Sequence, residues 1–277
     1  MAVVPGGAVA GIPLVELSGV SIAYDSPTGV YTAIEHIDLE IRRGQFLAIV
    51  GPTGCGKSTL LGAIAGLLAP AAGTIRIDGQ ELKGLNRLAV VMFQEDSLLP
   101  WKTLLANVAF GLQLRGVARR EREAKARDWI ASVGLAGFES SFPYQLSGGM
   151  RKRTSIAQAL IVQPEILLMD EPFSALDVQT RQIMEASLLD LWADSGASVV
   201  FVTHDLDEAI SLADEVVLLA AGPSSSIVGR YEVDLPRPRD LLSIKTTARF
   251  AELYSTIWGD LREEVIHSYE RSTRAGS

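Results

Sequence analysis

Three short stretches in the second half of the chain are apolar at nearly every position. They are rich in valine, isoleucine and leucine and cover residues 165–170, 197–204 and 214–220. Strands that are apolar on both faces are typical of a parallel sheet covered by helices on both sides. Stretches with the apolar spacing of a helix lie between and before them, over residues 56–68, 119–133, 147–162 and 177–195. This alternation predicts a parallel α/β sheet with crossover helices.

The first part of the chain has a different pattern, in which apolar and polar positions alternate. Short strands are predicted over residues 14–17, 20–24, 32–41, 45–50 and 73–80. Asp78-Gly79 predicts a tight turn at the end of the last of these. The first 80 residues therefore read as mostly strand.

The pattern also suggests where the chain divides. Residues 1–13 are interrupted by proline and glycine and are interpreted as a flexible N-terminal tail. The main folded domain is expected over residues 14–230, with a helical lobe over about residues 95–160. Residues 231–277 form a C-terminal extension whose last part has the spacing of an amphipathic helix. Two uses of that helix remain open, namely packing against the body of the same chain and forming a dimer or regulatory surface.

Composition narrows the class of protein. The 277 residues are 48% hydrophobic and 21% charged, which excludes a disordered, collagenous or coiled-coil chain. The net charge of −8 argues against broad electrostatic binding to nucleic acid phosphates, so no nucleic acid partner is expected. A single cysteine excludes a disulfide framework. The longest uncharged stretch, residues 58–75, contains glycine and proline, and no bilayer-spanning segment is predicted.

A glycine-rich loop follows the strand that ends at residue 50 and opens the next helix. It comprises Gly51, Pro52, Thr53, Gly54, Cys55, Gly56, Lys57, Ser58 and Thr59, which is the P-loop pattern in the strand–loop–helix context that it requires. Its backbone N–H groups and the helix N-terminus would hold phosphate oxygens, with Lys57 as a point charge. Ser58 supplies a hydroxyl for Mg²⁺. The neighbouring helix N-terminus predicts a lowered pKa and alkylation reactivity for the Cys55 thiol.

Two later strands end in polar residues. Asp170 and Glu171 follow the strand over residues 166–169, where Asp170 could reach Mg²⁺ and Glu171 could polarise a water that attacks the γ-phosphorus. His204 ends the strand over residues 199–203 and could contact the γ-phosphate or orient Glu171. Glu171, His204 and Lys57 are therefore the predicted catalytic residues.

A second helix N-terminus is built to approach an anion. Ser147, Gly148, Gly149 and Met150 open the helix over residues 147–162, with Ser147 as a suitable N-cap. With this motif in its expected order, the chain resembles the ATP-binding cassette ATPases over about residues 14–230. The resemblance implies a P-loop NTPase fold with a mostly parallel core, an antiparallel β subdomain and a helical signature subdomain. It also implies that Ser147–Met150 of one chain face the nucleotide held by a second, identical chain.

The resemblance assigns further residues to the site. It implies that Tyr24 stacks on adenine, that Gln94 senses Mg²⁺ and the permease, and that Ser58, Gln94 and Asp170 surround the Mg²⁺ of MgATP. The loop between the two nucleotide sites would be Ser174, Ala175, Leu176 and Asp177. Met150 replaces the commoner glutamine and Gln158 a frequent arginine, so the hydrolysis rate could differ from that of other members.

Several segments resemble the ATPase subunits of bacterial importers for nitrate, sulfonate and taurine. They are residues 98–101, 147–153, 205–219 and 235–239. The resemblance implies transmembrane permease subunits and an extracytoplasmic substrate-binding protein as partners, and a place at the cytoplasmic face of the inner membrane. Two alternatives remain, a soluble ABC ATPase acting in assembly or nucleic acid work and a nucleotide-dependent binding module without turnover. Retention of Lys57, Asp170, Glu171 and His204 argues against the second.

Overall fold

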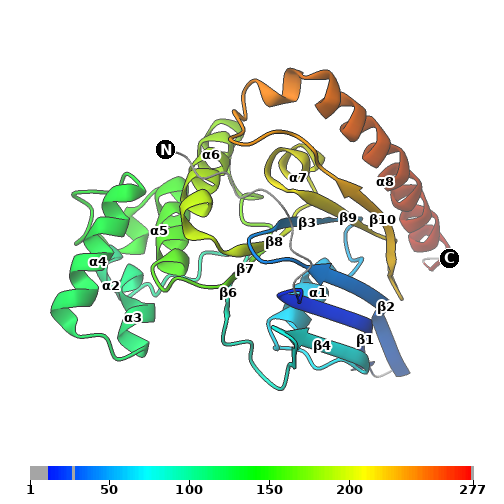
Figure 1. Ribbon diagram of the computed structural model, residues 1–277, viewed down its shortest axis with the longest axis horizontal. Coiled ribbons are helices and arrows are strands. Elements are labelled where there is room, and N and C mark those ends of the chain that lie inside the picture. Colours follow the sequence, from blue (N-terminus) through cyan, green and yellow to red (C-terminus); the bar gives the residue numbers. More distant parts are fainter. Residues whose placement is uncertain (1–11, 27–28, 276–277) are drawn as a thin grey trace.

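A six-stranded sheet forms the centre of the structure, a computed structural model that describes residues 12–26 and 29–275 (Figure 1). Its strand order is β10-β9-β3-β8-β7-β6. The bounds are β3 Phe46–Val50, β6 Ala89–Met92, β7 Ile166–Asp170, β8 Ser198–Val202, β9 Glu215–Leu219 and β10 Ile227–Glu232. Five of these strands run parallel, and only β10 pairs antiparallel with its neighbour. All but residues 12 and 13 of the predicted N-terminal tail lie outside the described residues.

The central strands are buried on both faces, as their apolar composition predicts. In β3 every residue is buried, and successive side chains enter different clusters. Phe46, Ala48 and Val50 join the core beneath the helices of one face. Leu47 and Ile49 join the core shared with the N-terminal strands. This alternation is the two-residue period of a strand packed between two layers.

A second sheet is antiparallel and has the order β2-β1-β4-β5. Its strands are β1 Val15–Ser26, β2 Gly29–Ile41, β4 Ala72–Ile77 and β5 Gln80–Glu81. Asp78 and Gly79 have φ values of 51° and 74°, which confirms the predicted tight turn between β4 and β5. The two short strands predicted before residue 25 are one strand, bent by a register shift at Gly19, where φ is 58°.

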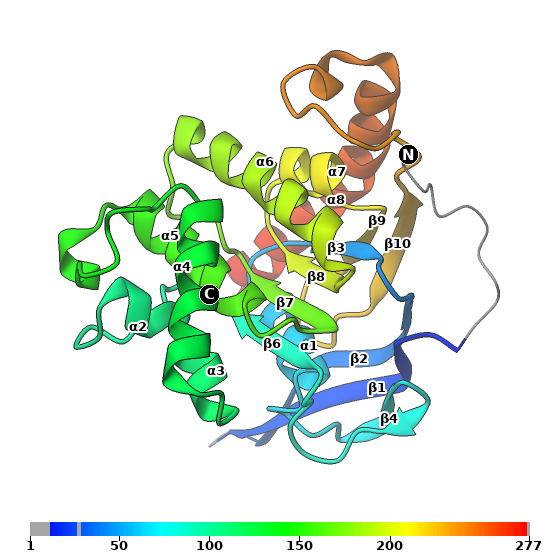
Figure 2. The ribbon, with the colours of Figure 1, turned by 60° about the vertical axis from the view of Figure 1, so that its left-hand side comes forward.

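Helices cover the central sheet from both sides. Their bounds are α1 Lys57–Ile64, α2 Leu104–Val108, α3 Phe110–Leu114, α4 Arg119–Ser132, α5 Gly148–Leu160, α6 Val178–Ser195, α7 Leu206–Leu212 and α8 Ala248–Ala275, with short 3-10 turns η1 Pro143–Gln145 and η2 Ile244–Thr246. Helix α1 contacts strands of both sheets and fills the space between them. Helices α2–α5 form a lobe of their own beside the sheet (Figure 2). The mostly parallel core, the antiparallel β subdomain and the helical subdomain confirm the predicted fold class.

Strands β6 and β10 are not among the strands predicted from the sequence. Both are edge strands of the central sheet, at opposite ends of its order. Only one residue of β6 is fully buried, and in β10 half-buried and exposed residues alternate. β10 lacks the continuous apolar run on which the prediction depends, whereas β6 lies within such a run, residues 88–93, that the prediction overlooked.

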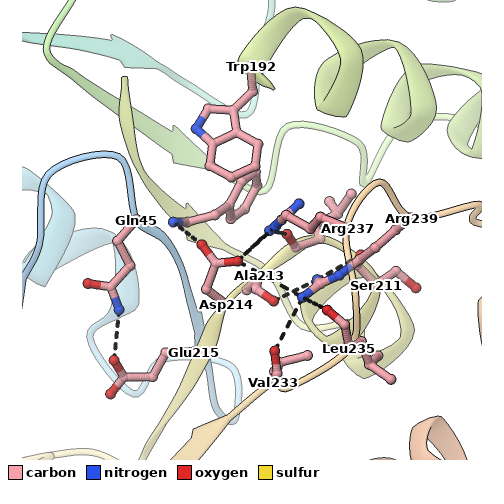
Figure 3. A network of polar contacts seen from close by, with 12 residues as sticks. Gln45, Trp192, Ser211, Ala213, Asp214, Glu215, Val233, Leu235, Arg237 and Arg239 are labelled. Carbon is pink, nitrogen blue, oxygen red and sulfur yellow. Dashed lines mark hydrogen bonds and ion pairs between the residues drawn. The ribbon is translucent and has the colours of Figure 1, made fainter. Parts of the chain in front are cut away.

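Two arginines attach the C-terminal segment to the rest of the molecule (Figure 3). Arg239 is 1% exposed and donates to backbone carbonyls at the end of α7, including Ser211 at 3.1 Å and Ala213 at 2.7 Å. Burial lowers the pKa of Arg239 to about 10, so the side chain stays charged at neutral pH. Arg237 forms an ion pair with Asp214 at 2.7 Å and lies over the ring of Trp192. Positive charge near the C-terminal carbonyls of a helix stabilises the helix.

Helix α8 then runs along the outside of the molecule toward the antiparallel sheet (Figure 1). Its residues Phe250, Leu253, Ile257 and Leu261 are buried in the same core as α7. Trp258 and Val265, on the same predicted stripe, remain 46% and 45% exposed. Within residues 12–26 and 29–275, no helix combines the length and apolar character needed to cross a bilayer.

Candidate nucleotide-binding site

Four adjacent parallel strands deliver the predicted site residues to one edge of the central sheet. Their order is β3, β8, β7 and β6. The glycine-rich loop follows β3, His204 follows β8, Asp170 ends β7, and Gln94 comes two residues after β6. Because the strands are parallel, their carboxyl ends lie together, which is where open α/β sheets bind ligands. Residues as far apart in the chain as Gly51 and His204 are thereby brought to one site.

The glycine-rich loop folds too tightly for side chains at two of its positions. A Cβ at Gly56, where φ is 95°, would lie 2.6 Å from the Ile34 side chain. A Cβ at Gly51 would lie 2.8 Å from Cys55 Sγ and 2.9 Å from a backbone oxygen of Leu219. The glycines therefore permit the close approach of this loop to β2 and β9.

Lys57 begins α1, and its side chain turns back over the loop. Its Nζ donates to the carbonyl oxygens of Gly51 at 2.9 Å and Pro52 at 3.1 Å. The residue is 6% exposed, so this charge is buried and satisfied by backbone oxygens. The ammonium group thus lies inside the curve of the loop, where phosphate oxygens would be held.

Cys55 does not have the chemistry that its position suggested. Its side chain is fully buried in the core of α1 and the β-sheets. Burial raises the pKa of the thiol, and this outweighs the lowering by Lys57 and by backbone N–H groups. The prediction of a lowered pKa is wrong, because desolvation of the thiolate dominates over the helix N-terminus. A buried, protonated thiol is a packing group rather than a reactive one.

Ser58 and Asp170 approach each other across the site. Ser58 Oγ donates to Asp170 Oδ1 at 3.0 Å. Burial raises the pKa of Asp170, the bond from Ser58 and the charge of Lys57 lower it, and Glu171 raises it further. A hydroxyl and a carboxylate oxygen therefore converge beside the ammonium group of Lys57.

Glu171 occupies a sharp turn immediately after β7. Its φ of 43° is in the left-handed region, which is uncommon for a residue other than glycine. The turn is held because Glu171 N donates to Val202 O at 2.9 Å and Ser174 Oγ donates to Glu171 O at 3.0 Å. Strained backbone of this kind clusters at functional sites. The turn directs the carboxylate of Glu171 toward the glycine-rich loop, since both line one cavity.

His204 lies next to this carboxylate. Its Nδ1 is 3.2 Å from Glu171 Oε2, a distance at which the imidazole N–H can donate to the carboxylate. The His204 side chain is 56% exposed and that of Glu171 is 23% exposed. The structure therefore places two of the predicted catalytic residues in contact at the solvent side of the sheet edge.

An open cavity of about 280 Å³ extends from the glycine-rich loop to two tyrosines. Tyr24 and Tyr31 are paired across β1 and β2, and Tyr24 also donates to Thr59 Oγ1 at 3.2 Å. Both rings are partly exposed, at 38% and 45%. An aromatic surface next to a phosphate-binding loop can stack on a base. Sequence analysis missed Tyr31, which the pairing of two strands around residues 25–30 could have indicated.

Gln94 takes part in a different set of contacts from those expected. Its side-chain amide donates to Ser174 Oγ at 3.3 Å, and its backbone carbonyl accepts from Lys152 Nζ at 3.3 Å. The structure thus joins Gln94 to the Ser174–Asp177 loop and to α5, whereas Ser58 and Asp170 bond each other. Asp177, at the end of that loop, caps α6 by accepting from Thr180 N at 3.0 Å.

The signature residues lie at the start of α5, in the helical lobe. Ser147 Oγ accepts from Met150 N at 3.3 Å, as predicted for an N-cap, and Gly148 and Gly149 begin the helix. Among the hydrogen bonds of the described residues, none joins Ser147–Met150 to the loop over residues 51–59. In both ribbon views α5 lies apart from α1 (Figures 1 and 2). The signature and the glycine-rich loop of one chain are separate.

Sequence analysis also missed the residues that attach α5 to the strand β6 segment. Arg151 and Lys152 both pair with Asp96, at 3.1 Å and 3.3 Å. Lys152 is only 4% exposed, so its charge depends on Asp96 and on the Gln94 carbonyl. The available signal was the pair of adjacent basic residues, Arg151 and Lys152, that directly follows Met150.

A buried carboxylate beneath the site leads to a stability prediction. Glu185 of α6 is 1% exposed, and its Oε2 has no hydrogen-bond partner among the described residues. Burial, and then the charge of Glu208, raises the pKa of Glu185 to about 7. Because this pKa exceeds the unfolded value, the folded state gains stability as the pH falls from 8 toward 5. At pH 8 the ionised group costs up to about 3 kcal/mol.

Glu185→Gln is therefore expected to raise the free energy of unfolding at pH 8 by about 1 to 3 kcal/mol, with little change at pH 5. Urea unfolding at both values measures this. Glu252→Gln, on the exposed surface of α8, is the control and should leave the pH dependence as it is in the native chain. An unchanged pH slope in Glu185→Gln would contradict the argument.

Comparison with known proteins places this geometry in a family. The family model for ABC transporters matches residues 34–174. An uncharacterized ABC transporter ATP-binding protein of Methanocaldococcus jannaschii is 48% identical over 236 residues, or 85% of this chain and 86% of that protein. A taurine import ATP-binding protein of Burkholderia pseudomallei is 41% identical over 249 residues, or 88% and 95% of the two chains. A taurine import ATP-binding protein of Rhizobium johnstonii is 43% identical over 86% of this chain and 90% of that protein.

Solved structures agree with the sequence relatives. A dimeric ATP-binding cassette in a post-hydrolysis state, bound to ADP and Pi, superposes with a TM-score of 0.70 at 30% identity, covering 80% of this chain and all of that one. The chain belongs to the ABC transporter family, as one of its ATP-binding proteins.

Proposed function

We propose that this chain is the ATP-hydrolysing subunit of a bacterial importer for a small sulfonate or related anion. The observation that carries the proposal is the convergence of Lys57, Asp170, Glu171 and His204 at one sheet edge. The cavity beside them ends in Tyr24 and Tyr31. These groups suit a nucleoside triphosphate, with phosphates in the glycine-rich loop and the base against the tyrosines. The taurine import proteins among the relatives support the solute class.

Hydrolysis needs a base for water and cations for the phosphate charge. Glu171, aligned by His204 Nδ1, would orient and polarise a water for in-line attack on the γ-phosphorus. Lys57 would exchange its bonds to Gly51 and Pro52 for bonds to the β- and γ-phosphate oxygens.

The residues present fit Mg²⁺. The described residues contain no cluster of three or more histidine, cysteine or acidic groups that would form an all-protein metal site. Mg²⁺ in nucleotide sites is held by one or two protein oxygens together with phosphates and water. Ser58 Oγ and Asp170 Oδ1, 3.0 Å apart, are such a pair, and Gln94 would join them after leaving Ser174. When bound, the ion would neutralise charge on the β- and γ-phosphates.

Two chains are proposed to form each complete site. The helix N-terminus at Ser147–Met150 is suited to bind an anion, and among the hydrogen bonds of the described residues none joins it to its own glycine-rich loop. In a head-to-tail dimer it would face the γ-phosphate held by the other copy. The dimeric cassettes among the solved structures support this arrangement.

A groove in the helical lobe is the proposed contact for the permease. It has a volume of about 210 Å³ and lies between β6, α3 and α5, with Phe93, Phe110 and Gln158 in its lining. Phe93, adjacent to Gln94, is 49% exposed. A permease loop bound here would hold the chain at the cytoplasmic face of the membrane, and a substrate-binding protein outside would select the solute. Reconstitution with candidate permease and binding-protein subunits tests this, by ATP-dependent uptake of labelled taurine.

The nucleotide assignment is tested by Lys57→Ala. Loss of the ammonium group removes a charge-assisted contact and is expected to weaken ATP binding about 10- to 100-fold. Titration with a fluorescent ATP analogue measures the affinity. Lys83→Ala, an exposed lysine near the β4–β5 turn, is the control. Unchanged affinity in Lys57→Ala would remove this lysine from the site.

A further inference from the structure

One arginine of α6 connects two loops of the site that sequence analysis treated as separate. Arg181 lies one turn after Asp177, the cap of α6. Its Nη2 donates to the Leu176 carbonyl at 3.3 Å, within the Ser174–Asp177 loop. Its Nη1 donates to Asp205 Oδ2 at 3.1 Å, in the residue immediately after His204. The side chain is 23% exposed, so these bonds are partly shielded from water.

The carboxylate of Asp205 connects Arg181 to the backbone around His204. Asp205 Oδ1 accepts from Asp207 N at 2.9 Å and caps α7, while Oδ2 is held by Arg181. Asp205 N in turn donates to Thr203 Oγ1 at 3.0 Å. The residues on both sides of His204 are thereby fixed, while the imidazole itself is half exposed and contacts Glu171.

A second acidic residue completes the network. Thr203 Oγ1 donates to Glu208 Oε2 at 2.6 Å, and Arg181 Nε lies 3.6 Å from Glu208 Oε1. Glu208 is 5% exposed, and burial raises its pKa. Arg181 is the basic residue in ion-pair contact with Asp205 and Glu208 among the described residues. Helices α6 and α7 lie side by side in both ribbon views (Figures 1 and 2).

We propose that Arg181 is a positioning residue that couples the Ser174–Asp177 loop to the His204 loop. The inference rests on the proposed two-chain ATPase, in which the Ser174–Asp177 loop lies between the two nucleotide sites. A displacement of that loop by the other site moves Leu176 and Arg181, and with them Asp205 and the backbone of His204. The planar guanidinium group bonds Leu176 and Asp205 at the same time, so a displacement of the first is transmitted to the second. Occupancy of one site thus sets the alignment of His204 with Glu171 in the other.

The test compares the full-length protein with Arg181→Gln and Arg181→Lys. ATP hydrolysis is measured against ATP concentration, the binding of a fluorescent ATP analogue gives the affinity, and thermal unfolding gives Tm. Arg43→Gln is the matched control, since Arg43 also bridges two carboxylates, Asp78 and Glu165. These residues lie near the amino ends of the central strands, away from the site at their carboxyl ends. Asp205→Asn keeps an oxygen for the α7 cap and removes the ion pair, so it supports the test where Arg181→Gln folds poorly.

In the native chain we expect cooperative hydrolysis with a Hill coefficient approaching about 2, the number of sites. Arg181→Gln and Asp205→Asn are expected to lower kcat about tenfold and the Hill coefficient to about 1, with ATP affinity within about twofold. Arg181→Lys should be intermediate and Arg43→Gln should match the native chain. A lower Tm with native kcat and native cooperativity in Arg181→Gln would reduce Arg181 to a structural role and overturn the inference. Absence of hydrolysis in the native chain would instead contradict the proposed function.

Discussion

Glu171→Gln is expected to lower kcat for ATP hydrolysis by at least about a hundredfold while leaving ATP affinity within about threefold. A positioned general base contributes about 10²- to 10⁴-fold to a rate, and an amide cannot accept the proton of the attacking water. The side chain does not take part in holding the loop over residues 51–59, which is braced by Lys57 and α1. Binding and hydrolysis should therefore separate in this variant.

The same change gives a second observable. If ATP closes two chains and hydrolysis reopens them, a variant that binds without hydrolysing should accumulate as a dimer in MgATP. Size-exclusion chromatography with and without MgATP detects it, beside single-turnover hydrolysis with radiolabelled ATP. Glu252→Gln provides an exposed glutamate-to-glutamine control. Hydrolysis by Glu171→Gln at the native rate would show that another group activates the water.

The position of the site could be predicted because each motif directly follows a strand that the apolar pattern predicts. Buried strands are continuous apolar runs, and in a parallel sheet their carboxyl ends coincide. The glycine-rich loop, Asp170 with Glu171, and His204 each follow such a run, so their meeting follows from the sequence alone. The edge strand β10 alternates half-buried and exposed residues and gives no comparable signal, while the apolar run that contains β6 was overlooked.

Other features depend on contacts between distant segments and could not be predicted. The pKa of Cys55 is decided by how completely α1 and the sheets exclude water, and burial outweighs the nearby helix N-terminus. Tyr31 differs from these features, because it lies opposite Tyr24 in the local pairing of β1 and β2, which the sequence could have indicated. The network around Arg181 unites residues 176, 181, 203, 205 and 208 through side-chain bonds, for which no periodic pattern exists.

Arginine substitution at the start of α5 tests whether one chain can complete a site. Ser147→Arg is expected to lower kcat about a hundredfold or more and to leave the affinity of the isolated chain for ATP within about twofold. Ser147 caps α5 and, within the described part of the chain, has no hydrogen bond to its own glycine-rich loop, so the bulky side chain is expected to disturb a nucleotide held by a second copy. Loss of a donor surface aimed at developing phosphate charge costs about 10²- to 10³-fold in rate.

The control and the concentration dependence make this result specific. Ser132→Arg places the same side chain at an exposed position in the same lobe and should hydrolyse ATP at the native rate. Loss of the α5 cap costs about 1 kcal/mol of stability, which thermal unfolding monitors separately. The native specific rate should also fall as the protein is diluted below the concentration at which two chains associate. A native kcat in Ser147→Arg, together with a specific rate unaffected by dilution, would mean that a single chain contains the whole catalytic site, because nothing then depends on the helix N-terminus of a partner.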